Sequence, residues 1–528
     1  MKKLFVLLLS FLSLASWSQE VQVRRGGCMP DLEADNVAAA RAQAPHKLRT
    51  INTNWDPTKV YRQLVILISF SDTDFSMENP QETYNRMFNE QGYNQRQGAG
   101  CVADYFRSQS RELFNLQFDV YGPYKVSSKA QPYDSPTVDT RNYGRESLRE
   151  ATQQFLSANP QLDFSPYDWN GDKSIEQVIY VCAGYSGNQS STKAYGYIWP
   201  NTSTFTTLPT HDGKTISDYS ASAEKWTNNT LCGIGTVCHE FTHSLGLPDI
   251  YPTNGWATSI VDEWDLMDGG NFTNYGWCPP NYTALEKMLM GWLTFEELTE
   301  PSTIIGMKPV SEGGKAYVVK HTDNEYLLLE NRQWTGWDAG LPGKGLVAYH
   351  VNYIASRWKA NSPNNTKDKP YFSLMDPDQM SYQEWVTYLK DEKGVTSQND
   401  VYQNASRMNS WIMNGAAYPH VWVDQTVIDS LTNTSPSATE MYNTNAAGSL
   451  LLSKPINNIK VSDDGLVSFD FMGGGTPTGI STLKTVAESN ATAVFDLNGR
   501  RMRSDVAGQK GIRLVRLADG TVRKLFFK

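Results

Sequence analysis

Residues 239–249 read HEFTHSLGLPD, and the spacing of the two histidines is the most informative feature of the chain. On an α-helix, which turns about 100° per residue, His239 and His243 lie about 40° apart on one face. Two imidazoles placed in this way can bind one zinc ion. The apolar residues of the same stretch gather on the opposite face: Ile234, Val237, Cys238, Phe241 and Leu245. The sequence therefore predicts an amphipathic helix that buries one face and presents metal ligands on the other.

Three more residues of this stretch complete a catalytic pattern. Glu240 lies beside the metal, where it can take a proton from a zinc-bound water as a general base. Gly246 allows the chain to reverse at the end of the helix, which can bring Asp249 to the zinc as third ligand. Carboxylates farther along the chain are alternatives for that ligand: Asp265, Asp268 and Glu286. Three protein ligands plus one water make an open, catalytic site.

A methionine follows the histidine stretch, in residues 263–270, EWDLMDGG. Several zinc proteases place a methionine-containing turn under the metal as an apolar floor, and Met267 is placed for that role. The alternative is an ordinary core methionine near a loop.

Segments on both sides of this region resemble the immune-inhibitor-A-type secreted metallopeptidases of bacteria. The matching stretches are RQLVILISFSDTDF from residue 62, GAGCVADYFRSQS from 98, LQFDVYGPY from 116, DWNGDKSIEQVIYVCAG from 168, WDLMDGGNFTNYG from 264, YTALEKMLMGWL from 282 and ENRQWTGWDAGLPGKGLVAYHVN from 330. The resemblance implies a zincin-type domain of α+β class, with a mixed sheet, a backing helix and the zinc-binding helix across the cleft. It also implies endopeptidase activity on proteins, and it supports Asp249 through the pattern HExxHxxGxxD.

One further role is expected by comparison with related enzymes, and a second is considered for Tyr275. The strand at residues 215–224 is expected to be an upper edge strand that holds an extended peptide through main-chain hydrogen bonds. Its alternative is an ordinary sheet edge. Tyr275 is either a stabiliser of the oxyanion or a packed aromatic side chain.

The pattern of apolar runs predicts the organisation of the rest of the chain. Strands are expected at residues 62–70, 116–121 and 176–183, and helices at 80–90, 102–108 and 143–157, all within a catalytic domain at 56–299. Short β-type runs between turn residues predict a β-rich domain, of sandwich type, at 300–475. A glycine-rich stretch at 473–479 then leads to a small β-type tail at 476–528.

The N-terminus has the pattern of an export signal. Lys2 and Lys3 precede an apolar stretch, residues 4–15, that is too short to span a bilayer, and small residues follow at Ser16 and Ser18. We therefore expect a signal peptide at 1–18, a propeptide or N-terminal segment at 19–55, and a mature protein that is secreted or lies at the cell surface. No other stretch is long and apolar enough to predict a transmembrane helix. The net charge of −9 argues against nucleic acid as a partner.

Residues 168–176, DWNGDKSIE, offer oxygen ligands at alternate positions, as a calcium-binding loop does. The candidate ligands are Asp168, Asn170, Asp172, Ser174 and Glu176. Lys173 and Ile179 depart from the EF-hand pattern, so a polar Asn-Gly turn before a strand is an equal alternative.

Two segments outside the catalytic domain suggest regulation and attachment. Cys28 lies in RRGGCMPD, which loosely resembles the cysteine-switch motif of matrix metalloproteases, so its thiolate could block the zinc in a zymogen. The alternatives are a disulfide or a free thiol among the six cysteines. The tail resembles C-terminal modules of exported Bacteroidetes proteins, some of which serve as sorting or surface-attachment signals. A small solvated β-module is an equal alternative.

These observations predict a secreted zinc endopeptidase that acts on protein or peptide substrates. The rival hypothesis is a surface-binding protein or adhesin, for proteins or glycans, on a zincin scaffold that no longer cleaves. The intact Glu240 argues against the rival, because a protein that only binds would not need the base.

Overall fold

The computed structural model describes residues 48–131, 140–187, 198–205, 209–226, 229–257, 259–367, 369–377, 414–421 and 425–475, together with three strands of the tail. The predicted signal peptide and Cys28 lie outside the described residues, as does most of the predicted propeptide. Among the described residues no helix is both long and apolar enough to cross a membrane.

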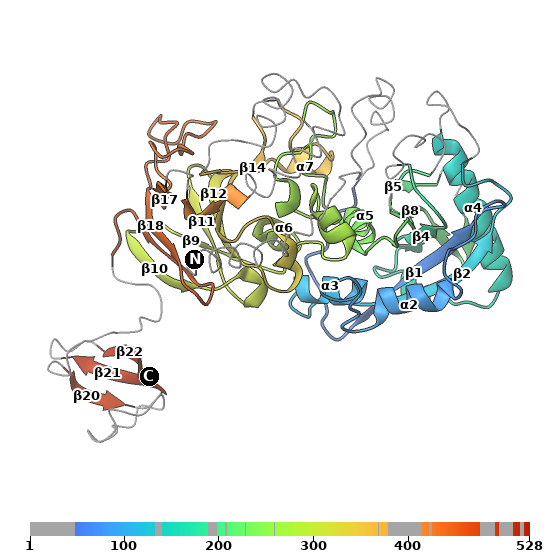
Figure 1. The fold of residues 1–528 in the computed structure, drawn as a ribbon, viewed down its shortest axis with the longest axis horizontal. Coiled ribbons are helices and arrows are strands. Elements are labelled where there is room, and N and C mark those ends of the chain that lie inside the picture. Colours follow the sequence, from blue (N-terminus) through green and yellow to red (C-terminus); the bar gives the residue numbers. More distant parts are fainter. Residues whose placement is uncertain are drawn as a thin grey trace, which may run out of the picture.

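A five-stranded mixed sheet forms the frame of the first half (Figure 1). Its strands, in spatial order, are β2 (Asn115–Lys125), β1 (Val60–Ser69), β4 (Val178–Cys182), β8 (Asp218–Ala223) and β5 (Asn201–Thr204). The first four strands run parallel, and β5 pairs antiparallel with β8 at the edge. The near-continuous apolar run of β1 is explained by its central place, because both of its faces are covered.

Alternate residues of β1 enter two separate cores. Val65 and Leu67 pack with α2 (Pro80–Asn89), α3 (Val102–Gln109) and α5 (Gly235–Leu245) on one face. Leu64 and Ile66 pack on the other face with α4 (Thr140–Ala158), which backs the sheet. The strands and helices expected in this half are confirmed, with small differences at their ends. A mixed α/β arrangement with a backing helix and a histidine-bearing helix is therefore present.

The expected edge strand at residues 215–224 is wrong in its position. The segment divides into β7 (Lys214–Ile216) and β8, and β8 lies inside the sheet with a neighbour on each side. β7 instead forms a small sheet with β3 (Ser174–Ile175) and β6 (Thr210–His211). The edge beside the histidine-bearing helix is β5, whose sequence NTST lacks the apolar alternation from which strands are recognised.

Three short helical segments follow α5 and lead to the second half: η2 (Asp262–Trp264), η3 (Gly270–Gly276) and α6 (Ala284–Leu289). A further short segment, η1 (Ser165–Tyr167), lies between α4 and β3 in the first half. Thr283 begins α6 with a capping box, in which its hydroxyl accepts from the Glu286 N–H and the Glu286 carboxylate accepts from the Thr283 N–H.

The second half contains two sheets that enclose a common core. The larger sheet consists of β9 (Phe295–Glu297), β11 (Ala316–Lys320), β12 (Glu325–Arg332), β13 (Gly345–Asn352), β14 (Phe372–Leu374) and β15 (Ala417–Tyr418). The smaller contains β10 (Ser302–Met307), β19 (Val467–Phe471) and β18 (Ile456–Val461). Leu327 and Leu329 of the larger sheet pack with Phe469 of the smaller. The remaining described elements are η4 (Val310–Glu312), η5 (Gly336–Gly340), α7 (Ala355–Lys359), η6 (Asn414–Ala416), β16 (His420–Val421) and β17 (Val427–Ile428).

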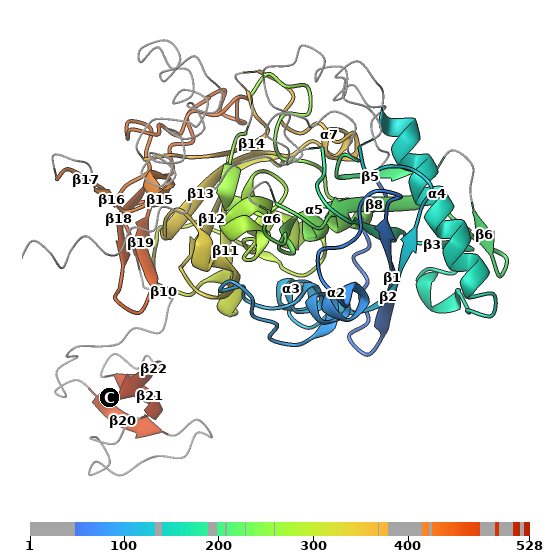
Figure 2. The same cartoon turned by 45° about the vertical axis from the view of Figure 1, so that its right-hand side comes forward.

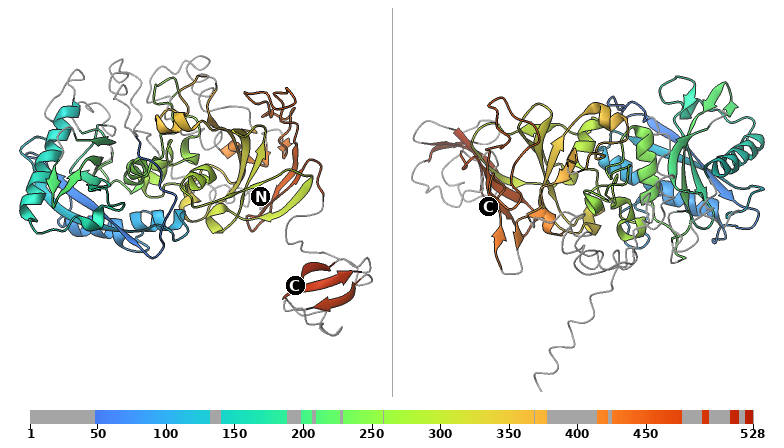
Figure 3. Two further views of the ribbon diagram at one scale, coloured as in Figure 1. Left: turned by 180° about the vertical axis from the view of Figure 1, so that it is seen from behind. Right: turned by 90° about the horizontal axis from the view of Figure 1, so that it is seen from above.

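The opposite face of the larger sheet belongs to the core of the first half. Val318, Leu328 and Tyr349 lie in the same apolar cluster as Phe241 of α5 and Trp264 of η2. Figures 2 and 3 show α5 and α6 between the five-stranded sheet and strands β11–β13. The larger sheet packs against the smaller sheet with one face and against the first half with the other. A β-sandwich domain that is separate from the first half therefore stays a prediction, as do the domain boundaries.

The tail contains an antiparallel sheet of β20 (Ala491–Phe495), β21 (Gly511–Leu517) and β22 (Val522–Phe527). The five cysteines within the described residues are buried and form no disulfide with one another: Cys101, Cys182, Cys232, Cys238 and Cys278.

Candidate metal centre and active site

Helix α5 contains both histidines and lies in the interior of the molecule. Every residue from Gly235 to Leu245 is buried, with Val237, Phe241 and Leu245 in the apolar core. The helix ends at Gly246, whose φ of +107° reverses the chain and whose N–H donates to the carbonyls of Thr242 and His243. A Cβ at Gly246 would lie 2.8 Å from the Arg49 carbonyl oxygen, so a side chain there is excluded by contact as well as by backbone conformation.

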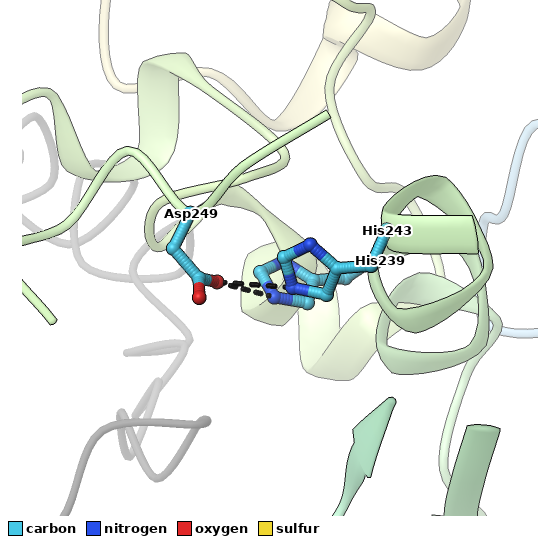
Figure 4. A group of neighbouring side chains, drawn as sticks. All are labelled: His239, His243 and Asp249. Carbon is cyan, nitrogen blue, oxygen red and sulfur yellow. Dashed lines mark ion pairs between the residues drawn. The ribbon is translucent and has the colours of Figure 1, made fainter. Parts of the chain in front are cut away.

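The chain reversal brings three side chains to one point (Figure 4). Asp249 Oδ1 lies 3.2 Å from His239 Nε2 and 3.1 Å from His243 Nε2. All three residues are buried, and their ligand atoms lie within 4.8 Å of one another. Among the described residues, this is the one group of three or more His, Cys, Asp or Glu side chains that could hold a metal ion.

The outer nitrogens of both rings are fixed by backbone carbonyls. His239 Nδ1 lies 2.9 Å from the Leu266 oxygen, and His243 Nδ1 lies 2.9 Å from the Leu247 oxygen. A carbonyl only accepts, so each Nδ1 carries a proton, and the Nε2 of each ring faces Asp249. Two ring nitrogens that face one carboxylate oxygen need a cation between them, either a proton or a metal ion. His239 Nε2 and Asp249 Oδ1 are buried without a hydrogen-bond partner, which fits a bound metal.

The pKa values of His243 and Asp249 also indicate a site that favours a cation. Burial opposes charge on His243, but the facing Asp249 carboxylate outweighs it and raises the pKa of His243 to about 9. Burial would likewise raise the pKa of Asp249, yet His243 and His239 hold it well below its usual range. The site is therefore built for positive charge opposite Asp249. Two imidazole nitrogens and one carboxylate oxygen are a donor set that suits zinc.

Glu240 is almost completely buried next to this cluster, and it contacts the edge strand. The Thr202 hydroxyl on β5 lies 2.9 Å from Glu240 Oε2 and 2.7 Å from the Glu240 carbonyl oxygen. Thr202 therefore donates to the residue predicted to be the general base. Sequence reasoning missed Thr202, because a threonine in a short polar strand carries no motif.

The turn that contains Met267 lies against α5. The Leu266 carbonyl orients His239, and the Met267 carbonyl accepts from the Ile250 N–H at 2.8 Å, one residue after Asp249. The Met267 side chain is fully buried in the same core as α5. This backbone position agrees with a turn beneath the metal, although the role of Met267 stays a prediction.

The alternative third ligands are engaged elsewhere. Asp268 accepts from the Ser259 hydroxyl and from the backbone N–H groups of Ile260, Val261 and Asp262. Asp265 Oδ1 accepts from the Met267 N–H at 2.6 Å, and burial together with the neighbouring Glu286 carboxylate raises the pKa of Asp265 well above its usual range. Burial also raises the pKa of Glu286, to about 7.

Many hydrogen-bonding groups of the 168–176 loop are paired with one another. Asp168 accepts from the N–H groups of Gly171, Asp172 and Lys173, and Asp172 Oδ1 accepts from the Ser174 N–H. Asn170 Nδ2 donates to Asp172 Oδ2 at 3.1 Å, and Glu176 Oε2 accepts from the Trp169 N–H. Within the part of the chain that the structure describes, these carboxylates do not form a group of three whose ligand atoms lie within 4.8 Å of one another, so calcium binding stays a prediction.

Tyr275 packs with aromatic neighbours. Its ring lies edge-on to Trp226, with 5.9 Å between the ring centroids, in a small cluster that includes Phe272. This contact suits the alternative of a packed aromatic side chain, and the oxyanion role remains a prediction.

Comparison with known proteins finds a match to one family model. Residues 58–288 match the immune inhibitor A peptidase M6 catalytic domain. The match confirms the resemblance seen in the sequence, and it includes the histidines, Glu240 and Asp249. The match supports a metallopeptidase in general.

The individual relatives of this chain are distant. The pre-pro-metalloprotease PrtV of Vibrio cholerae serotype O1, from two strains, is 22% identical over 306 residues, which cover 49% of this chain. The chain matches about a third of the length of these relatives, 33%. Among solved structures, metalloproteinase-II from Bacteroides fragilis aligns with 16% identity and a TM-score of 0.21, over 48% of this chain and 60% of that one.

Proposed function

We propose that this chain is a zinc-dependent endopeptidase that hydrolyses peptide bonds in proteins, with Glu240 as the general base. The observation that carries the proposal is the convergence of His239 Nε2, His243 Nε2 and Asp249 Oδ1, with Glu240 on the same helix. The match to a peptidase family supports it independently.

The residues of the site have separate roles in hydrolysis. His239, His243 and Asp249 would hold zinc, which supplies Lewis-acid activation of water and of the scissile carbonyl. Glu240 accepts the proton of the attacking water and passes it to the leaving amine. Thr202 orients the Glu240 carboxylate, and the Leu266 and Leu247 carbonyls fix the ring orientations of the histidines.

The proposal extends to parts of the chain that lie outside this geometry. We propose an exported precursor with a signal peptide at 1–18 and a propeptide at 19–55, secreted or held at the cell surface by the tail. The division into a catalytic domain, 56–299, and a β-rich sandwich-type domain, 300–475, belongs to the same proposal. Zymogen control through Cys28 and a calcium ion at residues 168–176 complete it.

Hydrolysis of casein by purified protein and by Glu240→Ala tests the proposal. Both are assayed before and after limited proteolysis to remove a propeptide, and zinc content is measured for each. We expect Glu240→Ala to lose roughly 10²–10⁴-fold in activity while it keeps zinc. The exposed Glu300→Ala is the matched control and should hydrolyse as the wild type does. Processed wild-type protein that contains zinc but does not cleave casein or a peptide library would favour the binding-protein rival.

A further inference from the structure

Asn361 makes a reciprocal pair with Asp249 across 112 positions of the sequence. The Asp249 N–H donates to Asn361 Oδ1 at 2.6 Å, and Asn361 Nδ2 donates to Asp249 Oδ2 at 2.8 Å. Only one orientation of the Asn361 amide satisfies both contacts, because a backbone N–H requires an acceptor and a carboxylate requires a donor. Both the backbone and the side chain of Asp249 are therefore fixed by one residue.

Asn361 is itself held from two directions. Its N–H donates to the Trp358 carbonyl at 3.1 Å, at the end of α7, and Trp358 is buried in the core. The Asn361 carbonyl accepts from the Thr253 hydroxyl at 3.0 Å, in the loop that follows Asp249. Its φ of +51° lies in the left-handed region, which asparagine adopts more readily than most residues. Asparagine therefore suits this position in two ways: its backbone tolerates the left-handed conformation, and its side-chain amide can pair with Asp249.

We propose that Asn361 is a positioning residue for the metal centre, which makes Asp249 present Oδ1 alone to the metal. Asp249 Oδ2 is occupied by the Asn361 amide, whereas Oδ1 points at both histidine nitrogens and has no hydrogen-bond partner. Asp249 is thus set to be a monodentate ligand. This inference rests on the proposed function, because the zinc site is part of that function.

In this proposal, the second half of the chain contributes a residue that supports the metal site. Asn361 lies outside residues 58–288, the extent of the family match, and it follows α7 in the β-rich half. The matched region alone therefore holds three ligands but lacks the group that fixes the third. Loss of a residue that orients a metal ligand typically costs about 10–100-fold in metal affinity.

The test compares full-length Asn361→Gly with Asn365→Ala. Glycine removes the amide and tolerates the left-handed backbone, so it separates the side chain from backbone strain. Asn365 is the matched control, because its side chain contacts Thr253 in the same loop but its hydrogen bonds do not reach Asp249. Zinc affinity is measured by competition with a chromogenic chelator, and the absorption spectrum is recorded after replacement of zinc by cobalt(II).

Asn361→Gly should bind zinc roughly 10–100-fold more weakly than wild type, with Asn365→Ala unchanged. Its cobalt(II) spectrum should weaken, because a freed Asp249 can bind through both oxygens and raise the coordination number. If Asn361→Gly fails to fold, Asn361→Asp keeps the acceptor for the Asp249 N–H and removes the donor to Oδ2. The same change of spectrum is then expected.

The two proposals fail in different ways. Wild-type zinc affinity and a wild-type cobalt spectrum in a folded Asn361 variant would overturn the role of Asn361, whatever the activity. Zinc binding that depends on Asn361, in a wild-type protein that cleaves no peptide bond, would overturn the proposed endopeptidase and leave the role of Asn361 intact.

Discussion

The Thr202 hydroxyl contacts Glu240 twice, at its carboxylate and at its carbonyl oxygen. Thr202→Val keeps the shape of the side chain and removes the donor, so the Glu240 carboxylate loses its fixed orientation. We expect kcat to fall roughly tenfold, the equivalent of about one hydrogen bond, with little change in KM. Thr202→Ser should retain most of the activity. Equal losses in both variants, measured by steady-state kinetics on a peptide substrate, would assign the effect to the packing of β5 instead.

Glu176 should make the stability of the protein depend on pH. Burial raises the pKa of Glu176 to about 7, although the Trp169 N–H and Arg49 oppose the rise. The ordinary pKa of a glutamate in an unfolded chain is about 4.3, so the folded state binds more protons between these two values. Stability should therefore fall as pH rises through this window. Glu176→Gln should flatten that fall, as measured by thermal unfolding across the pH range, and an unchanged slope would contradict the assignment.

The same residue offers a test of calcium binding. A calcium ion in the 168–176 loop would favour ionised Glu176 and offset its burial. Millimolar calcium should then raise the unfolding temperature of the wild type near neutral pH by more than it raises that of Glu176→Gln. Equal responses would remove calcium from the proposal.

At the scale of the element, the end of α5 depends on Gly246. An alanine there would adopt a strained backbone at φ +107° and would bring its Cβ within 2.8 Å of the Arg49 carbonyl oxygen and the Ile51 side chain. We expect Gly246→Ala to lower the free energy of unfolding by about 1–3 kcal/mol, measured by chemical denaturation. Gly213→Ala is the control, since Gly213 also has a positive φ but has open space around it. Similar losses of unfolding free energy in both variants would show that the contact of position 246 with residues 49–51 has no effect on stability.

Among the elements, those with a strong local pattern could be predicted from the sequence. The apolar run of β1 and the histidine spacing of α5 follow from periodicity, and Gly246 follows from the need for a left-handed cap. The edge strand β5 could not be predicted, because NTST is short and polar. Asn361 could not be predicted either, because its contact with Asp249 arises from the fold of two distant segments and leaves no local pattern.

At the scale of the whole molecule, the two halves should fold as one unit. The larger β-sheet completes the core around α5, and the buried Arg332 guanidinium links β12 to the first half through the carbonyls of Trp264 and Asn281. Arg332 is itself neutralised by Asp338 and Glu330. A chain that ends at residue 299 should therefore lack a cooperative unfolding transition by circular dichroism and should not bind zinc tightly.

A chain that ends at residue 475 is the control for this truncation. It keeps both sheets of the second half and loses only the tail, so its unfolding temperature and its casein hydrolysis should match those of the full-length protein. A shorter chain, ended at 299, that folds cooperatively and binds zinc as tightly as the control would show that the first half is independent.

The long separation between Asp249 and Asn361 also has a consequence for the timing of synthesis. A ribosome that has just completed α5 has made both histidines and Glu240, but it must add another 112 residues after Asp249 before the partner of that carboxylate exists. A growing or prematurely ended chain would thus carry the recognisable motif without a fully ordered metal site. In our proposal, such a chain binds zinc more weakly until residue 361 has been added, so the metal site is completed well after the histidine motif itself.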